Sequence, residues 1–415
     1  MASTFMDVAS GAAILKTYYT NEQRLNWLIY KNFPALALVK KNQEMKGSIY
    51  PVPVLYATSQ GASSSFANAQ TNQTPAASVV YQMTRKSDYS LFSVTNEAYL
   101  ASEGSAAAFV SLLTTAADGG FRTATMRLSS HMFRSGTGSI GQIATGGITA
   151  GVITLTNIAD LNQFEVGQTL QANSTDGGAT PRAALGFVIA VDRSPVGGTL
   201  TVSATAQGGA AGSPAGWAAA DFLLVQGDNN ACVSGMDAWF PTTAPGTSDS
   251  FYGVNRSTDS RLSGYRFNAT SQSLEEGILE AAIRTGEQGA ASSHCFMPFT
   301  SYAGLQKSLA SRLFWEDITS EEDASIGFRA IVIQGPVGKI YVLADRYMQA
   351  SRAFLLDLET CRMGSIGRAP RVLEYADGLS TLRINNADAL EGRCGMYGNF
   401  YSTAPIFNAS IQISQ

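Results

Sequence analysis

A glycine-rich stretch in the first half of the chain limits the possible folds more than any other feature of the sequence. Residues 135–226 hold 16 of the protein's 40 glycines, only seven charged residues and no lysine. Glycine disfavours helix interiors. Four apolar, strand-like runs separated by Gly and Pro turns lie in this stretch: VITLTNI (152–158), GFVIAV (186–191), TLTVSA (199–204) and FLLV (222–225). We therefore predict a small inserted β-barrel or sandwich without helices, at residues 142–228.

The best helical pattern comes just before this stretch, at about residues 97–134. Its apolar positions recur at spacings of three, four and seven: Phe109, Leu113, Ala117, Ala124, Leu128 and Met132. Gly119 and Gly120 are expected to weaken its middle. About 30 residues would span roughly 45 Å, which is long for a globular core. We expect this helix to brace a flat subunit.

The amino-terminal 45 residues are predicted to form an arm with one short helix. Thr20 and Gln23 make a capping box, and Pro34 is expected to end the helix. The arm has too little apolar sequence to fold alone. It is also the one mildly basic stretch of a chain whose net charge is −4, so no general surface for gripping nucleic acid is predicted.

Two strand-like segments follow the arm, at residues 46–56 and 77–94. Pro51 and Pro53 confine the first segment to a sheet edge. The polar stretch 58–76 between the two segments cannot pack on itself. We expect a long two-stranded flap that would be unstable in isolation.

After Asp237 the pattern predicts mixed helices and strands. Ser273 and Glu276 form a capping box at the start of a helix that runs to Gly286, and a second helix is expected from Ser301. The strand HCFMP lies between them. The strands FRAIVIQ and KIYVLA flank the turn GPVG, which predicts a hairpin and not a phosphate-binding loop. This is α+β alternation without the rhythm of a parallel sheet.

Charged residues make up only 14% of the chain, roughly half the usual share, while hydrophobic residues make up 45%. Such a chain stays soluble most easily if much of its exterior becomes an interface, as in obligate assemblies. The alternative explanation of this composition is a Gly/Ala-rich β protein whose loops have no special function. The first residues carry Asp7 and no basic segment before an apolar core, so we expect neither a secretory signal nor a membrane span.

Few residues are suited to catalysis or ligand binding. Gly136, Gly138 and Gly141 spell G-x-G-x-x-G, but here a helix precedes the motif and strands follow it, the reverse of a dinucleotide site. The chain has only two histidines, His131 and His294. We predict no catalytic, cofactor-binding or metal-binding residues. We also predict that all four cysteines are buried free thiols: Cys232, Cys295, Cys361 and Cys394.

The carboxy-terminal third carries short motifs in a telling order. They are a GP turn (Gly335 and Pro336), Ala344 with Asp345, a Leu-Leu-Asp strand (Leu355 to Asp357), a G-x-A-P turn (Gly367 to Pro370), D-A-x-E-x-R (Asp388 to Arg393), and Ala404 with Pro405. In kind and order they resemble the motifs of tailed double-stranded DNA phage major capsid proteins with the HK97 fold. The organisation upstream is also similar to that family.

The resemblance implies an α+β fold of the HK97 type with a small all-β insertion domain. The expected parts are an N-terminal arm (1–45), an E-loop hairpin (46–96), a long spine helix with the start of the P-domain (97–141), the insertion (142–228), a mainly A-domain region (229–360), and C-terminal strands of the A- and P-domains (361–415).

The resemblance also implies a function. The chain would be a major capsid protein, not an enzyme, that self-assembles in the host cytoplasm into hexamers and pentamers of an icosahedral phage head. The inner face would contact the packaged DNA non-specifically. The expected partners are other copies of the chain, a scaffolding protein, a portal and, as a further candidate, a decoration protein. Neither a cofactor nor a membrane is expected.

Assembly contacts are expected on the arm, the flap and the closing strands. The candidate interface residues are Trp27, Lys40, Lys41, Phe66, Arg85, Lys86, Glu391 and Arg393. The chain departs from some relatives at two points. It lacks their long leading scaffold segment, so we expect a separate scaffolding protein. It also has no lysine at the flap tip, so we expect no covalent crosslinks between subunits.

Two other functions fit less of the sequence. An encapsulin-like nanocompartment shell would share the fold and enclose cargo enzymes, but the β insertion and the flap tip favour a phage. A secreted β-rich glycan-binding or hydrolytic protein would use Trp217, Trp239 or Trp315 as stacking platforms, together with a pair of acids. No carboxylate pair stands out.

Overall fold

The computed structural model describes residues 32–97, 112–309, 315–319, 327–374, 381–385 and 387–414, in two compact units. The described part of the first unit lies in Asn32, Asp88–Met126 and Pro370–Met396. The second unit is made of Phe33–Ser87, Arg127–Ala369 and Tyr397–Gln415. The fold is α+β, as predicted. No helix among the described residues is both long and apolar enough to cross a membrane.

In the first unit, two glycines lie against the ring of Phe92. The strands of this unit are β4 (Lys86–Thr95), β18 (Arg371–Val372), β19 (Thr381–Arg383) and the part of β20 (Ala389–Ser402) up to Met396. The last of these pairs with the other three. A Cβ on Gly120 would lie 3.0 Å from the ring of Phe92, and a Cβ on Gly392 would overlap that ring. Gly120, which we expected only to weaken a helix, therefore makes room for Phe92.

That helix, α4 (Leu112–Met132), is described over 21 residues, or about 32 Å. It ends two residues before the predicted boundary, and residues 98–111 lie outside the described part of the chain. Ala124, Leu128 and Met132, three of the predicted apolar positions, are buried.

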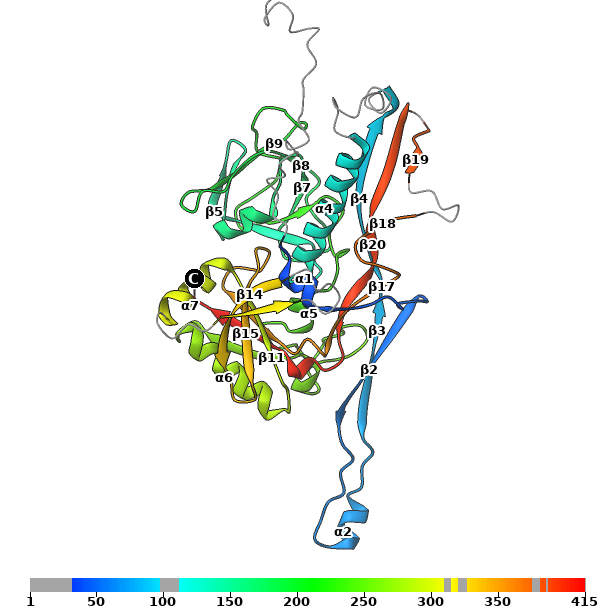
Figure 1. The fold of residues 1–415 in the computed structure, drawn as a ribbon, viewed down its shortest axis with the longest axis vertical. Helices are drawn as coiled ribbons and strands as arrows, with labels where there is room; N and C mark the ends of the chain where they lie inside the picture. The colour runs from blue at the N-terminus through cyan, green and yellow to red at the C-terminus, as the bar shows by residue number, and fades with distance from the viewer. Residues whose placement is uncertain are drawn as a thin grey trace, which may run out of the picture. The chain divides into compact units, whose positions relative to one another are not determined.

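The flap is an antiparallel hairpin of β2 (Ile49–Ala57) and β3 (Ala77–Thr84), which extends to α2 (Phe66–Thr71) at its end (Figure 1). The hairpin was predicted, but helix α2 was not. Arg85 divides the predicted second segment into β3 and β4. The pairing runs from Ile49 opposite Thr84 to Ala57 opposite Ala77, with one irregularity near the tip.

The structure corrects the prediction for Pro34. This residue begins helix α1 (Pro34–Leu38) and does not end a helix. Proline fits the first turn because its fixed φ is helical and its missing N–H would have no partner there. The helix predicted from Thr20 lies outside the described residues. β1 (Lys40–Asn42) follows and pairs in parallel with β17 (Cys361–Ser365).

The glycine-rich stretch forms a closed barrel, in the order β10-β5-β6-β9-β8-β7 (Figure 1). The strands are β5 (Ser139–Thr149), β6 (Val152–Leu155), β7 (Thr169–Asn173), β8 (Leu185–Asp192), β9 (Thr199–Ser203) and β10 (Phe222–Val225). Its interior is filled by buried side chains such as Ile143, Phe164 and Val188. The prediction that this stretch has no helix was wrong, because Ile158–Gln163 forms a 3₁₀ helix, η1.

A mixed seven-stranded sheet makes up most of the rest of the second unit, in the order β11-β21-β16-β12-β15-β14-β13. The strands are β11 (Tyr265–Ala269), β12 (His294–Met297), β13 (Trp315–Thr319), β14 (Gly327–Gln334), β15 (Lys339–Ala344), β16 (Arg352–Leu356) and β21 (Ala409–Ile413). Residues of α6 (Leu274–Glu287) and α7 (Phe299–Leu309) share its core. The predicted capping box at Ser273 is present, and the GPVG turn joins β14 to β15.

Two other local predictions are confirmed. Gly136 and Gly138, both with φ of +89°, lie in the turn from helix α4 into strand β5, which is the reverse of the order in a dinucleotide site. All four cysteines are free and buried.

Candidate assembly interface

The outer face of the flap is exposed and carries no charge. Side chains alternate along β2 and β3, so that paired residues share a face. Ile49, Leu55 and Val80 lie on the outward face and are 49%, 67% and 46% exposed. Pro51 and Pro53, on the same face, are also exposed. On β3 the same face also carries the uncharged polar side chains of Ser78, Gln82 and Thr84. Exposed apolar side chains gathered on one face of a hairpin are typical of an interaction site.

The opposite face of the hairpin is buried within the second unit. Val52, Val54, Tyr81 and Met83 are each at most 7% exposed. The Tyr81 ring lies 4.9 Å from that of Trp239, centroid to centroid, and its hydroxyl donates a hydrogen bond to a backbone carbonyl oxygen at 2.8 Å. The root of the flap is therefore fixed by side-chain packing.

A buried polar network centred on Asn399 fixes the same root, and we did not predict it. The Asn399 amide nitrogen donates to the Thr84 carbonyl oxygen at 3.0 Å and to the Tyr252 hydroxyl at 2.7 Å. Its side-chain oxygen accepts a hydrogen bond from the backbone N–H of Ser234 at 2.9 Å. Gln82 on β3 donates its backbone N–H to the Tyr252 carbonyl oxygen. No local sequence pattern relates Asn399 to residues more than 140 positions away.

The flap tip is uncharged and exposes one large aromatic side chain. Phe66, the first residue of α2, is 82% exposed, and none of the helix is buried. Gln60 and Thr74 close the base of the tip through a pair of backbone hydrogen bonds. Gly61, with φ of +140°, allows the chain to pass close to Ala69. The tip is thus a defined structure that presents Phe66 outward.

The structure places the predicted interface lysines of the arm on β1. Lys40 forms an ion pair with Glu359 at 2.6 Å, and this hydrogen bond holds the pKa of Glu359 below its ordinary value. Exposed pairs of this kind contribute at most about 1 kcal/mol. Lys41 is half-buried on the same strand. Trp27, the remaining candidate on the arm, lies outside the described residues.

Arg85 and Lys86 have partners within the second unit. Arg85 donates to the carbonyl oxygen of Gly47, and the Lys86 ammonium donates to that of Asn230 at 2.9 Å. Both side chains therefore help to seat the base of the flap.

In the first unit, Glu391 and Arg393 share a face of β20 and form an ion pair with each other at 2.8 Å. The same unit exposes two apolar side chains of β4, Tyr89 and Leu91. None of these observations brings the eight predicted interface residues into one cluster.

The Ala-Asp motif holds the end of the arm. The buried carboxylate of Asp345 accepts hydrogen bonds from the backbone N–H of Tyr347 at 2.9 Å and from that of Ala35, in α1, at 3.5 Å. Burial raises the pKa of Asp345 to about 6, although both hydrogen bonds oppose the rise. The Phe33 and Tyr347 rings stack above this contact.

We expect Asp345→Asn to remove a pH dependence of stability. The pKa is about 6 in the folded chain and about 3.9 in the unfolded one, so the folded state holds the proton more tightly. The stability that this group contributes is complete below pH ~4 and is lost as the pH rises through 6, by up to about 3 kcal/mol. Urea unfolding of the unassembled wild type and variant from pH 4 to 8 would measure it. Parallel stability curves would contradict the prediction.

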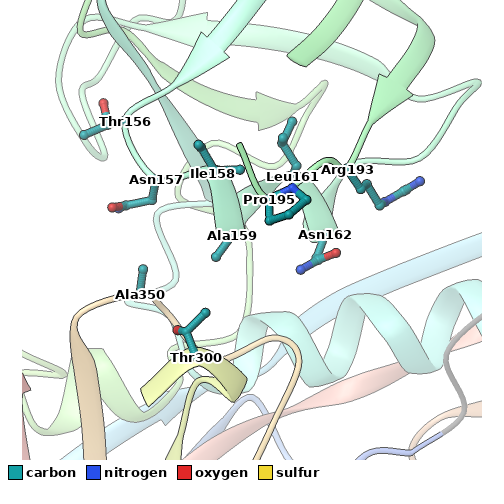
Figure 2. A pocket seen from close by; sticks show the side chains of 10 residues that line it. All are labelled: Thr156, Asn157, Ile158, Ala159, Leu161, Asn162, Arg193, Pro195, Thr300 and Ala350. Atoms are coloured by element: carbon teal, nitrogen blue, oxygen red, sulfur yellow. The ribbon is translucent and has the colours of Figure 1, made fainter. Parts of the chain in front are cut away.

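A cavity of about 450 Å³ lies between the barrel and the end of the sheet, within the second unit. Figure 2 shows Ile158, Ala159 and Leu161 of η1 on one side, and Thr300 and Ala350 on the other. Among the described residues that line it, Arg193 is the one charged side chain, and no carboxylate, histidine or cysteine is present. The lining supplies no acid–base or nucleophilic pair.

The structure also weighs against the glycan-binding alternative. Trp239 is fully buried, Trp217 is nearly so, and Trp315 packs against the core of the sheet. Asp160 and Asp237 line a smaller polar cavity of about 210 Å³, where each is paired with an arginine, Arg134 and Arg352 respectively. These three tryptophans, all among the described residues, are not exposed as stacking platforms, and these two acids are already engaged in ion pairs.

One group of described residues could hold a metal ion, and we did not predict it. His131, Asp228 and Cys232 place their ligand atoms within 4.8 Å of one another. His131 lies about a hundred residues from the other two in the sequence, so no spacing motif predicts the group.

Comparison with solved structures identifies the fold. The chain matches the Cyanophage A-1(L) capsid with a TM-score of 0.57 and 12% identity, over 99% of this chain and 100% of that one. It matches the capsid of the native GTA particle with a TM-score of 0.52 and 9% identity, over 100% of both chains. An encapsulin complex from Synechococcus elongatus PCC 7942 matches with a TM-score of 0.45, 8% identity and coverage of 99% and 96%. No protein-family model and no curated protein matches the sequence.

Proposed function

We propose that this chain, which has the HK97-type fold of capsid shell proteins, is the major capsid protein of a tailed double-stranded DNA phage. The fold supports a structural role in a shell made of many copies. The observation that carries the proposal further is the outer face of the flap, where Ile49, Leu55 and Val80 are exposed without a charge nearby on that face.

The flap face is suited to contact another copy of the chain. Burying a Leu, Ile or Val side chain fully contributes about 1.5–3 kcal/mol, so three such side chains would supply several kcal/mol per flap. The tip, with Phe66 exposed, extends the same apolar character. In a shell this moderate contact is repeated at every subunit. The summed free energy of these contacts would stabilise hexamers and pentamers.

The proposal assigns the described elements to the parts expected of this fold. We assign the E-loop to β2, β3 and α2, the spine helix to α4, and the A-domain mainly to the seven-stranded sheet with α6 and α7. Strand β20 and the strands paired with it would belong to the P-domain. The closed barrel from β5 to β10 would be an insertion in the P-domain region.

The proposal includes partners and a location. The shell would assemble in the host cytoplasm around a scaffolding protein and a portal, and it would become the head of the virion. Packaged DNA would touch the inner face without sequence preference. The net charge of −4 and the lack of an extended basic stretch in the sequence fit weak, non-specific contact with DNA. A decoration protein is a further candidate partner.

Negative-stain microscopy of the purified full-length chain tests this function. Shells, tubes or capsomers are expected, and a dispersed monomer that binds glycans would refute the proposal. The content of particles isolated from cells distinguishes the two shell functions. Phage heads contain DNA, whereas an encapsulin-like shell contains a cargo enzyme.

Mature particles are expected to contain no covalent links between flaps and neighbouring subunits. The tip from residue 58 to residue 76 has no lysine, and the nearest lysine on its carboxy-terminal side, Lys86, is engaged with Asn230 at the root. Particles boiled in detergent should therefore run as a single chain on a denaturing gel. A ladder of multimers would show that the prediction is wrong.

A further inference from the structure

A buried group of three potential metal ligands lies at the carboxy-terminal end of α4, within the second unit. The Nε2 atom of His131 is 3.6 Å from the Sγ atom of Cys232 and 3.9 Å from Oδ2 of Asp228. His131 and Cys232 are only 3% and 7% exposed. Two segments that lie about a hundred residues apart in the sequence thus direct three chemically different side chains at one small volume.

We propose that this group binds one zinc ion. Thiolate and imidazole ligands select zinc and similar borderline metals, and not magnesium or calcium. In tetrahedral zinc sites the metal–sulfur distance is about 2.3 Å and the metal–nitrogen distance about 2.0 Å, which places N and S roughly 3.5 Å apart. The distance from His131 to Cys232 matches this separation. The Asp228 carboxylate oxygen, which is 3.9 Å from Nε2 of His131, would have to move closer to reach the roughly 3.3 Å of a tetrahedral site, and a water molecule would complete the tetrahedron.

The charges of the ligands themselves suit a dication, although Arg127 and Arg134 also place positive charge near His131. Metals bind imidazole in its neutral form. On binding, the Cys232 thiol would release its proton to solvent. Zinc then balances the thiolate and the Asp228 carboxylate, and the net charge of the three is zero.

Arg127 would act as a supporting partner of the carboxylate ligand. Its Nη2 atom lies 3.0 Å and 3.1 Å from the two carboxylate oxygens of Asp228. Ligating carboxylates are commonly oriented in this way by a second hydrogen-bonding residue. The guanidinium would fix the orientation of the carboxylate.

A bound ion would fasten the junction at which several parts of the second unit meet. The loop that carries Asp228 and Cys232 also carries Asn230, whose carbonyl oxygen accepts from Lys86 at the root of the flap. The Asn230 side chain donates to Gly177 in the barrel, and its backbone N–H donates to Thr137 after α4. Zinc would therefore link this loop to the end of α4 and, through Asn230, support the flap root.

Metal analysis of the purified full-length chain tests the proposal. After saturation with zinc and removal of excess, about one zinc per chain is expected, and cobalt substitution should produce a near-ultraviolet thiolate-to-cobalt absorption band. Zinc should displace cobalt, whereas excess calcium or magnesium should not. The wild-type measurement alone decides against the site if the folded chain retains no stoichiometric zinc and shows no thiolate band.

Matched variants then locate the ion. His131→Gln and Cys232→Ser should lose the bound metal and the band, while His294→Gln and Cys394→Ser should keep both, because His294 and Cys394 lie outside the group. If a variant does not fold, the wild-type cobalt spectrum still decides whether a thiolate binds the metal. Retention of the band in folded Cys232→Ser would overturn the assignment.

Discussion

Leu55→Asp or Val80→Asp should reduce shell formation by at least about tenfold while the unassembled chain stays folded. Both side chains lie on the outer face of the flap, at 67% and 46% exposure. An aspartate without a partner in an apolar interface costs several kcal/mol, and about 1.4 kcal/mol already corresponds to a factor of ten in association. Removing exposed side chains should change the free energy of unfolding of the unassembled chain by no more than about 1 kcal/mol.

Sedimentation of assembly reactions, with urea unfolding of the unassembled chain, would measure both effects. Val196→Asp is the matched control, because Val196 is even more exposed but lies in a barrel turn far along the chain from the flap. It is expected to assemble normally. Shells formed by Leu55→Asp at the wild-type yield, or equal loss in the control, would refute the role of the flap face.

Tyr81→Ala should have the opposite pattern and destabilise the unassembled chain by about 3–5 kcal/mol. Tyr81 is fully buried, packs its ring at a tilt of 57° against that of Trp239 and donates a hydrogen bond to the Leu262 carbonyl oxygen. Tyr81→Phe keeps the ring and loses only that hydrogen bond, so a smaller loss of about 1 kcal/mol is expected.

Val80→Ala is the control for Tyr81→Ala because the two residues are adjacent on β3 and face opposite sides. Its free energy of unfolding should stay within about 0.5 kcal/mol of the wild type. Chemical denaturation of all three variants would show the order. Similar losses of unfolding free energy for Val80→Ala and Tyr81→Ala would mean that the hairpin does not pack against the second unit through one face alone.

Local sequence rules predicted the elements whose causes are local. The alternation along β2 and β3, the capping box at Ser273 and the GPVG turn each depend on a few neighbouring residues, and each is present in the structure. The barrel was also foreseeable, because glycine-rich, β-branched runs leave few other choices. Where only one end of an element was considered, as at Pro34, the prediction was wrong, since proline can begin a helix as readily as it follows one.

Features that depend on distant residues could not be read from the sequence. Asn399 joins Thr84 and Tyr252, and His131 meets Cys232, only because the fold brings these segments together. Helix α2 was missed for another reason: its sequence, FANAQT, has no apolar periodicity and buries nothing. The candidate interface residues were proposed from their type and position, and most of their side chains have partners within their own unit.

The closure of the barrel has a consequence for crowding. In a shell, many identical subunits sit at a very high local concentration, and any open sheet edge offers unpaired backbone groups to the next copy. Each of the six barrel strands instead has a neighbour on both sides, so the barrel presents no such template. Its loops, rich in Gly, Ser and Thr, are therefore free to change in sequence without creating strand exchange between subunits. A closed barrel can therefore be inserted into a shell subunit without creating unwanted strand pairing between neighbouring subunits.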